Sequence, residues 1–242
     1  MSDALVFKGG TCLAKVHAEF YRLSEDLDFV IPMPTDAMRA DRSMRAAGLK
    51  DAVAVLTRHN SVFRVVQSLT GANKSTQYIA VVGYASLLSR QEETIKIEVG
   101  LREPLLTNVF SGSARTILLD PVTGQPLLRP VAMRCISKIE AFAEKFRAAL
   151  SRREVAIRDF YDIDYAVRRL GIKPQDTHLI GLIRQKLAVP SNEPVDVSEN
   201  RLITLRQQLE PQLKPVLRAR DFAEFNLERA FRTVGEMATK VV

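Results

Sequence analysis

The sequence predicts an α+β protein, with a mixed β-sheet domain over residues 1–136 and a helical domain over residues 137–242. Two patterns lead to this prediction. Before residue 137, short segments of alternating apolar and polar residues are separated by turn residues, as in strands. From Ser137 onward, apolar residues recur every three to four positions, as in helices that bury one face. The 242 residues, of which 46% are hydrophobic, suffice for one large or two small domains.

The first three predicted elements are a strand, a helix and a second strand. Ala4–Phe7 is a short apolar segment that runs into the glycine turn Gly9-Gly10. Thr11–Tyr21 carries apolar residues at helical spacing and is expected to form a helix. Arg22–Ile31 follows as a strand and is ended by the prolines after it.

A longer helix and a group of strands complete the predicted sheet domain. The helix is expected to end near Arg58, with Thr35 or Asp36 as its N-cap. The strands are expected at Ser61–Leu69, Thr76–Leu88, Thr94–Val99, Arg115–Leu119 and Leu127–Ile136. The segment Thr70–Lys74 contains Gly and Asn, and it predicts a hairpin turn between the first two of them.

The helical domain begins with two predicted helices. The first covers Ser137–Arg153, and the second starts near Arg158 and ends at Gly171 as a C-cap. Three basic residues recur at intervals of seven on one flank of the first helix, where they can bind phosphates: Lys138, Lys145 and Arg152. Residues 172–242 show amphipathic helices without a recognisable motif.

The composition favours a cytoplasmic protein with an anionic partner. The chain has 35 Lys and Arg against 28 Asp and Glu, a net charge of +7, which is compatible with binding to RNA or DNA. No apolar run approaches the roughly 20 residues of a membrane span. Met1–Ala4 lacks the layout of a secretory signal. Cys12 and Cys135 do not have the spacing of a zinc site or a disulfide framework.

The pair Asp26 and Asp28 is the most informative feature of the sequence. In a strand these two side chains project from the same face, and about 4 Å apart they would repel by about 4 kcal/mol unless a cation such as a divalent metal ion binds them. Just upstream, Gly9-Gly10 allows a phosphate to approach the backbone, and the Thr11 hydroxyl supplies a donor. A solvated strand face and an ordinary turn are the alternative interpretations. Together the two features indicate phosphoryl or nucleotidyl transfer.

Glu98 is the candidate for a third metal-binding carboxylate. It shares one face of the predicted strand Thr94–Val99 with Lys96. If this strand runs antiparallel to the strand of Asp26 and Asp28, Glu98 reaches the same site. The alternative is that Lys96 and Glu98 form a solvent-exposed face.

The order Gly-Gly-Thr-x-Leu, a helical segment and Arg-x-Ser-x-Asp-x-Asp resembles the entry motif of the DNA polymerase beta-like nucleotidyltransferases. In its form here, with Lys8 before the glycines and Phe29 after the second Asp, it is similar to the AbiEii/AbiGii toxin family of that superfamily. The resemblance implies that Mg²⁺ or Mn²⁺ is held by Asp26, Asp28 and Glu98. It also implies nucleotide binding by Lys8, Gly9, Gly10, Thr11, Ser24 and Lys145. The chain departs from the family in having Glu rather than Asp at the third metal position.

A second block is similar to the same family. Ala143-Glu144-Lys145 is followed by Arg158-Asp159-Phe160-Tyr161-Asp162, and by spacing alone this would be a helical hairpin with solvated or paired charges. The resemblance implies that Lys145 holds the triphosphate and that Asp159 orients Lys145 or positions the acceptor. The helical domain would then complete the active site. Arg158 and Asp162 are expected to form supporting pairs.

The function implied by the resemblance is metal-dependent transfer of a nucleoside monophosphate from a nucleoside triphosphate (NTP) to an acceptor. The acceptor would be RNA, with the acceptor end of tRNA as the leading candidate, and the protein would be the toxin of a toxin–antitoxin pair with a cognate antitoxin as partner. Two alternatives stay open. One is nucleotidyl transfer to a small molecule or a protein, and the other is a catalytically silent nucleic-acid-binding or partner-binding protein with the same fold.

Overall fold

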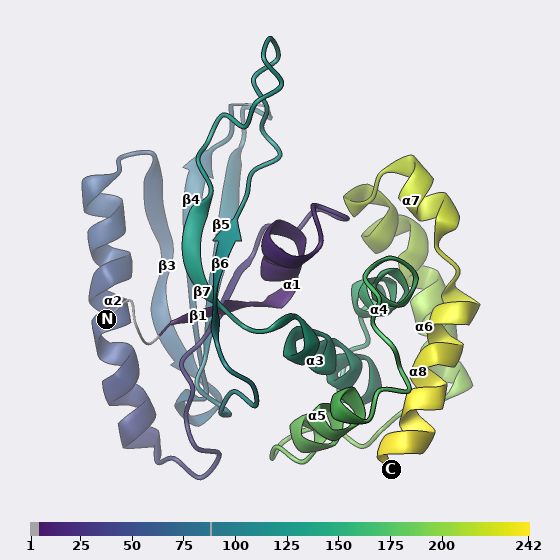
Figure 1. The fold of residues 1–242 in the computed structure, drawn as a ribbon. Helices are drawn as coiled ribbons and strands as arrows, with labels where there is room; N and C mark the ends of the chain where they lie inside the picture. Colours follow the sequence, from purple (N-terminus) through teal and green to yellow (C-terminus); the bar gives the residue numbers. More distant parts are fainter. Residues whose placement is uncertain (1–4, 88) are drawn as a thin grey trace. The chain divides into compact units, whose positions relative to one another are not determined.

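The computed structural model describes residues 5–87 and 89–242, which form two compact units (Figure 1). The first unit comprises the chain through His17 together with Ser24–Ile136. The second comprises Ala18–Leu23 together with Ser137–Val242. The predicted α+β class is confirmed, because a mixed sheet in the N-terminal half is followed by helices. The assignment of the short segment Ala18–Leu23 to the helical unit has no counterpart in the sequence analysis.

The first unit is built on a seven-stranded sheet with the order β3-β4-β5-β2-β1-β7-β6. The strands are β1 (Val6–Lys8), β2 (Leu27–Val30), β3 (Phe63–Ala72), β4 (Gln77–Ala85), β5 (Glu92–Gly100), β6 (Phe110–Ala114) and β7 (Val131–Cys135). β1 pairs antiparallel with β2 and parallel with β7, whereas β2 pairs parallel with β5. The two central strands, which come first in the sequence, therefore lie beside strands that come much later.

The helix after β1 differs from its prediction. It consists of α1 (Gly9–Cys12) and the π-helical turn η2 (Leu13–His17), so it begins at Gly9 and ends at His17. Glu19 and Phe20 have φ values of +50° and +57°, a left-handed conformation that cannot continue a right-handed helix. The predicted helix Thr11–Tyr21 is therefore correct in position but too long at its C-terminal end.

The long helix α2 (Arg39–His59) packs against β3 in the same unit (Figure 1). The prediction that Thr35 or Asp36 caps this helix is wrong, since Met38 is the N-cap residue and its side chain makes no capping bond. The segment before it forms a turn instead, in which the Ala37 amide donates to the Pro34 carbonyl. The Arg42 guanidinium of α2 donates to the carbonyl of Leu101, at 3.1 Å, and so joins the helix to the end of β5.

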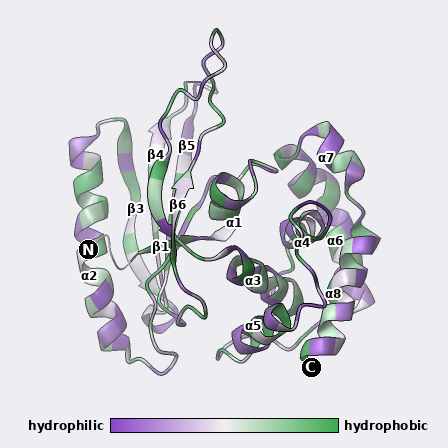
Figure 2. Cartoon of the chain, in the orientation of Figure 1, coloured by the Kyte–Doolittle hydropathy of each residue, from purple (hydrophilic) through white to green (hydrophobic). Residues whose placement is uncertain are grey.

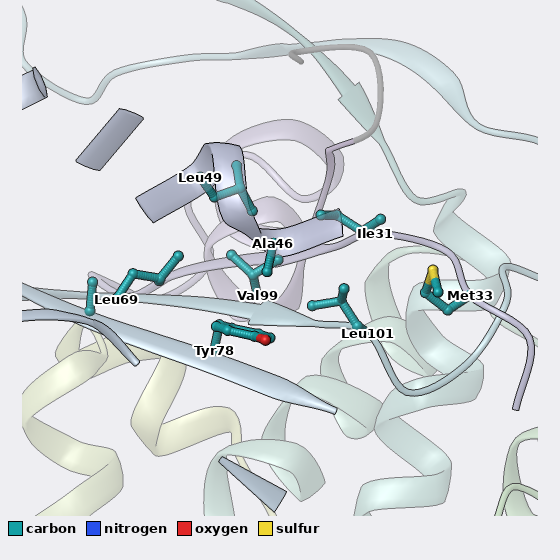
Figure 3. Packing of buried hydrophobic residues seen from close by; sticks show 9 residues of the cluster. Ile31, Met33, Ala46, Leu49, Leu69, Tyr78, Val99 and Leu101 are labelled. Carbon is teal, nitrogen blue, oxygen red and sulfur yellow. The ribbon is translucent and has the colours of Figure 1, made fainter. Parts of the chain in front are cut away.

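The core of the first unit lies between α2 and the sheet (Figure 3). Its buried residues come from the chain after β2, from α2, and from β3, β4 and β5: Ile31, Met33, Ala46, Leu49, Leu69, Tyr78, Ala80, Val99 and Leu101. Because these side chains are buried, they fix the end of β2 that follows the two Asp residues. The position of the acidic segment thus depends on apolar packing further along its own strand.

The last two strands of the sheet are shifted relative to the sequence prediction. The predicted strand Arg115–Leu119 is wrong, because β6 ends at Ala114 and Leu119 makes only an isolated bridge with Pro126. The sequence of β6, Phe-Ser-Gly-Ser-Ala, has one large apolar residue and a Ser-Gly-Ser centre without strand-favouring side chains, so it does not reveal a strand. The hairpin turn between β3 and β4 also moves, to η3 (Asn73–Ser75). Two ends of predicted strands, Ala4 and Leu88, lie outside the described residues.

The second unit is helical throughout. Its helices are α3 (Lys138–Ser151), α4 (Ile157–Arg169), α5 (Thr177–Leu187), α6 (Glu199–Gln208), α7 (Ala219–Glu224) and α8 (Leu227–Val241), with the short turns η4 (Leu209–Leu213) and η5 (Lys214–Val216). α3 packs against α4, α5 and α8. Figure 2 shows hydrophilic and hydrophobic positions mixed along α8, as expected of a helix with one buried face. Gly171 follows the C-cap Leu170 with φ of +71°, as predicted.

None of the described helices is long and apolar enough to cross a membrane. This finding agrees with the absence of long apolar runs in the sequence.

The N-terminal cap of α3 provides a test of this fold. The Ser137 side chain accepts a hydrogen bond from the Glu140 amide, so Ser137→Ala should lower the free energy of unfolding by about 1 kcal/mol. Ser198 is the N-cap of α6 but makes no capping bond. Ser198→Ala is therefore the control and should cost less than about 0.5 kcal/mol. Urea unfolding followed by circular dichroism measures both, and equal costs would contradict the assigned cap.

Candidate active site

The glycine turn and the acidic strand meet in the first unit. β1 ends at Lys8, which lies opposite Asp28 in the antiparallel pair β1–β2, and α1 begins directly afterwards at Gly9. Gly9 has φ of +73°, and a Cβ atom built on it would lie 2.0 Å from Oδ2 of Asp28. No side chain fits at this position. The two sequence features that predicted a phosphate site and a metal site are therefore in direct contact.

Thr11 and Ser24 fix the chain that leads to Asp26. The Thr11 side chain is buried, and its hydroxyl donates to the backbone carbonyl of Asp26 at 2.5 Å and lies 2.9 Å from the Ser24 hydroxyl. Asp26 itself precedes β2, which begins at Leu27. In this structure the two hydroxyl groups thus hold the acidic segment, whereas the sequence analysis expected them at the phosphates of the nucleotide. Gly10 lies within α1, next to Gly9.

Glu98 lies beside Asp28, although not in the expected direction. The prediction of antiparallel pairing is wrong, because β2 and β5 run parallel with Asp28 paired to Glu98. Parallel pairing requires a long connection, and α2, β3 and β4 supply it. Residues paired in register share a face of the sheet, so the side chains of Asp28 and Glu98 emerge from the same face.

A lysine neutralises this acidic group. Nζ of Lys96 lies 2.7 Å from Oε2 of Glu98, and the exposed fractions of the two side chains are 41% and 28%. Burial alone would raise the pKa of Glu98, but the hydrogen bond and charge of Lys96 lower it below its ordinary value. Burial would lower the pKa of Lys96, but Glu98, with the charges of Asp26 and Asp28, raises it. At neutral pH the group therefore contains ionised Glu98 and protonated Lys96.

The donor chemistry of the three carboxylates fits Mg²⁺ or Mn²⁺, since both ions prefer oxygen ligands. Within the described part of the chain, however, no three His, Cys, Asp or Glu residues gather closely enough to hold a metal ion. The salt bridge to Lys96 explains part of this, because it directs the Glu98 carboxylate to an ammonium group. The ammonium of Lys96 thus supplies one positive charge near Asp26, Asp28 and Glu98. The sequence predicts that a divalent metal ion binds to these three carboxylates.

The second motif forms a buried ion cluster within the helical unit. Nζ of Lys145, on α3, lies 2.7 Å from Oδ1 of Asp159 and 2.8 Å from Oδ2 of Asp162, both on α4. Only 14% of the Lys145 side chain is exposed. Burial would lower the pKa of Lys145, but the two carboxylates raise it, so this lysine stays charged. The predicted pairing of Lys145 with Asp159 is present in the structure.

Asp162 has a second cationic partner, Arg22, which the sequence did not predict. Nε and Nη2 of Arg22 donate to the two oxygens of Asp162 at 2.5 and 2.9 Å, and the Tyr21 hydroxyl donates at 2.6 Å. Both residues come from Ala18–Leu23, which explains why this segment belongs to the helical unit. Arg158, which was expected to form a supporting pair as well, is exposed. Burial would raise the pKa of Asp162, but Arg22 and Lys145 hold it well below the ordinary range.

The three basic residues predicted on one flank of α3 interact with other groups of the helical unit. Lys138 donates to the Leu170 carbonyl at 2.9 Å, and Nη1 of Arg152 lies 3.6 Å from Oδ2 of Asp159. This Oδ2 is buried and has no hydrogen-bond partner among the described residues. Of the two oxygens of Asp159, one therefore orients Lys145 and the other retains capacity to accept a hydrogen bond.

Replacing Gly9 tests the close packing against Asp28. Gly9→Ala should lower the free energy of unfolding by about 2 kcal/mol or more, because it adds a clash with the carboxylate to the strain of positive φ. Gly124 is a matched control, with φ of +67° and no atom within 4 Å of a built Cβ. Gly124→Ala should cost only the strain, about 1 kcal/mol. The difference between the two variants in urea unfolding measures the contact, and no difference would refute it.

Replacing Asp162 tests the ion cluster. Asp162→Asn should destabilise the protein by about 3 kcal/mol at pH 7, since it leaves Arg22 buried without the carboxylate that it pairs with and leaves Lys145 with Asp159 alone. Because the folded pKa is lowered, the stabilisation is complete above the unfolded pKa of about 4 and is lost as pH falls through the lower folded pKa. The wild type should therefore lose more stability than the variant between pH 7 and pH 3.

Urea unfolding at the two pH values measures this effect. Glu210→Gln, which removes the exposed pair with Lys214, is the control and should cost less than about 1 kcal/mol. A cost for Asp162→Asn no larger than that of the control would show that the cluster does not stabilise the unit.

Solved structures of nucleotidyltransferases share this fold at low sequence identity. MenT4, a nucleotidyltransferase toxin from Mycobacterium tuberculosis H37Rv, is similar with a TM-score of 0.58 and 17% identity, covering 99% of this chain and 80% of that chain. A proposed nucleotidyltransferase from H. pylori is similar with a TM-score of 0.50 and 17% identity, covering 98% and 86%. A search of curated proteins gave no match.

The family comparison covers nearly the whole chain. The sequence model of the family described as nucleotidyl transferase AbiEii toxin, type IV toxin–antitoxin system, matches residues 1–234. This match includes both motifs, the whole first unit and the second unit up to residue 234. The chain therefore belongs to the AbiEii family of nucleotidyltransferase toxins of type IV toxin–antitoxin systems.

Proposed function

We propose that this protein transfers a nucleoside monophosphate from an NTP to an RNA acceptor, with tRNA as the leading candidate, in a reaction that requires Mg²⁺ or Mn²⁺. The observation that carries the proposal is the contact between the glycine turn and the acidic strand, in which Gly9 leaves no room for a side chain beside Asp28. A turn that admits a phosphate and carboxylates that attract a cation are the two requirements for binding a metal-complexed triphosphate.

The carboxylates of the first unit have the roles of metal ligands and proton acceptor. Asp26, Asp28 and Glu98 would hold the divalent ion, which when bound neutralises charge on the triphosphate and polarises it for attack. Glu98 is ionised at neutral pH and can accept the proton of the acceptor hydroxyl. Asp28 and Glu98 are paired in register on neighbouring strands, which supports a role of both residues in binding the same metal ion.

The turn residues bind phosphate in this proposal. Gly9 and Gly10 offer their backbone at the start of α1 to the phosphate oxygens, without a side chain in between. Lys8, opposite Asp28, adds positive charge to this part of the unit and contributes to the lowered pKa of Glu98. Thr11 and Ser24 support the site through the Asp26 backbone.

The helical unit contributes charge neutralisation and positioning. Lys145 would neutralise negative charge on the leaving pyrophosphate, and Asp159 would orient its ammonium through the 2.7 Å ion pair. Oδ2 of Asp159 makes no hydrogen bond among the described residues, although Arg152 lies 3.6 Å away, and in this proposal it accepts a hydrogen bond from the acceptor. Catalysis in this scheme comes from positioning and electrostatics, as is general for phosphoryl transfer.

The family supports a biological role as a toxin. As an AbiEii toxin, the protein would act in the cytoplasm, where modification of tRNA would arrest translation, and a cognate antitoxin would counteract it. The net charge of +7 favours a nucleic acid over a small or protein acceptor, because a polyanion gains most from a basic surface.

Nucleotide incorporation tests the proposal. The purified protein is incubated with total RNA, Mg²⁺ and each labelled NTP in turn, and label should appear in the tRNA fraction. Asp26→Asn combined with Asp28→Asn should lower incorporation at least about 100-fold, because the hard anionic ligands are lost. Asp41→Asn combined with Asp51→Asn removes the same charge from exposed positions of α2 and should retain activity.

The outcomes separate the alternatives. If label appears in a protein or a small molecule and tRNA stays unlabelled, the acceptor is not RNA and the proposed acceptor class is wrong. Full activity of the Asp26 and Asp28 double variant would refute catalysis at this strand. No incorporation by the wild type into any acceptor would favour a catalytically silent protein.

A further inference from the structure

Lys96 is a basic residue within the acidic group of the first unit. It lies two residues before Glu98 on β5, so both side chains emerge from the same face of the sheet. Its Nζ is bonded to the Glu98 carboxylate, and it also interacts electrostatically with Asp26 and Asp28. The cation is thus bonded to one of the three residues to which metal binding is assigned and is attracted by the charges of the other two.

This arrangement differs from an ordinary surface salt bridge. An isolated exposed pair contributes little to stability and is readily replaced by water. Here Glu98 is partly buried and has a second polar partner, since the Gln77 side chain also hydrogen-bonds it. The carboxylate therefore has a defined orientation toward Lys96 while no divalent cation is bound.

We propose that Lys96 is the resident counter-ion of Asp26, Asp28 and Glu98, and that it must release Glu98 before this carboxylate can bind a divalent cation. The inference rests on the proposed function, because it concerns the same metal site. The pairing of Glu98 with Lys96 is also a physical reason why no three metal ligands lie close together among the described residues.

The exposure of Lys96 makes such a release feasible. With 41% of the side chain accessible, the ammonium can leave Glu98 on its flexible stem and remain hydrated. A monovalent and a divalent cation repel each other within a few ångströms, so the two compete for the carboxylate. Once released, the ammonium is free to pair with phosphate oxygens, which couples metal binding to nucleotide binding.

Binding of Mn²⁺, measured by electron paramagnetic resonance on the full chain without nucleotide, tests the inference. Lys96→Met keeps the length of the stem and removes the charge, and it should bind Mn²⁺ about tenfold more tightly than the wild type. A non-hydrolysable NTP analogue should tighten Mn²⁺ binding by the wild type more than by this variant. Lys96→Arg keeps the cation and should retain weak binding.

Lys74→Met is the matched control for net charge, because Lys74 is exposed on η3 of the same unit. It should bind Mn²⁺ as the wild type does. Equal affinity of Lys96→Met and the wild type, or weaker binding by Lys96→Met, would overturn the inference. Circular dichroism of each variant establishes that it is folded.

Asp28→Asn separates this inference from the function on which it rests. If the wild type binds Mn²⁺ and Asp28→Asn does not, the metal site stands, and the behaviour of Lys96→Met alone decides the inference. If Asp28→Asn binds Mn²⁺ as tightly as the wild type, the proposed metal site is wrong, and the inference fails with it.

Discussion

The site in the first unit depends on the packing of the Asp28 carboxylate against the backbone of Gly9. Only glycine permits this contact, because a Cβ atom would lie 2.0 Å from the carboxylate oxygen and the φ of +73° disfavours any side chain. The contact follows from antiparallel pairing of β1 with β2, and parallel pairing of β2 with β5 adds Glu98 on the other side. Turn, acidic strand and third carboxylate are thus fixed by one short piece of central sheet.

Both units place carboxylates close together and neutralise them with cations of the same chain. The difference lies in burial. Asp162 is fully buried between Arg22 and Lys145, and Lys145 also pairs with Asp159, so removing either cation would leave two buried carboxylates with one cation. The cluster is therefore a permanent part of the fold. Lys96 and Glu98 are partly exposed, so the Lys96 ammonium can leave Glu98 and remain hydrated. Ion pairing therefore stabilises the fold of the helical unit, whereas in the sheet unit the ion pair of Lys96 with Glu98 can open.

The sequence predicted those features that depend on local spacing. The α+β order, the shared face of Lys96 and Glu98 and the pairing of Lys145 with Asp159 all follow from residues close together or from two recognisable motifs. The parallel direction of β2 and β5 was missed because it depends on the 60-odd residues between them, which form α2, β3 and β4. β6 was missed because its Ser-Gly-Ser centre contains no β-branched or aromatic residue of the kind that favours strands. The bond between Arg22 and Asp162 joins residues 140 positions apart, and neither alone indicates the other.

The first motif, from Arg22 to Asp28, is divided between the two units. Arg22 belongs to the helical unit and acts through Asp162, whereas Ser24, Asp26 and Asp28 belong to the sheet unit. A continuous motif of seven residues therefore combines two physical tasks. Arg22 and Tyr21 neutralise and fix a buried carboxylate on α4, which keeps Lys145 oriented by Asp159 and Asp162. The residues after Leu23 present carboxylates to a cation. The sequence pattern alone indicates a single acidic site that includes Arg22. A substitution of Arg22, however, removes a partner of Asp162 and is expected to destabilise the helical unit directly.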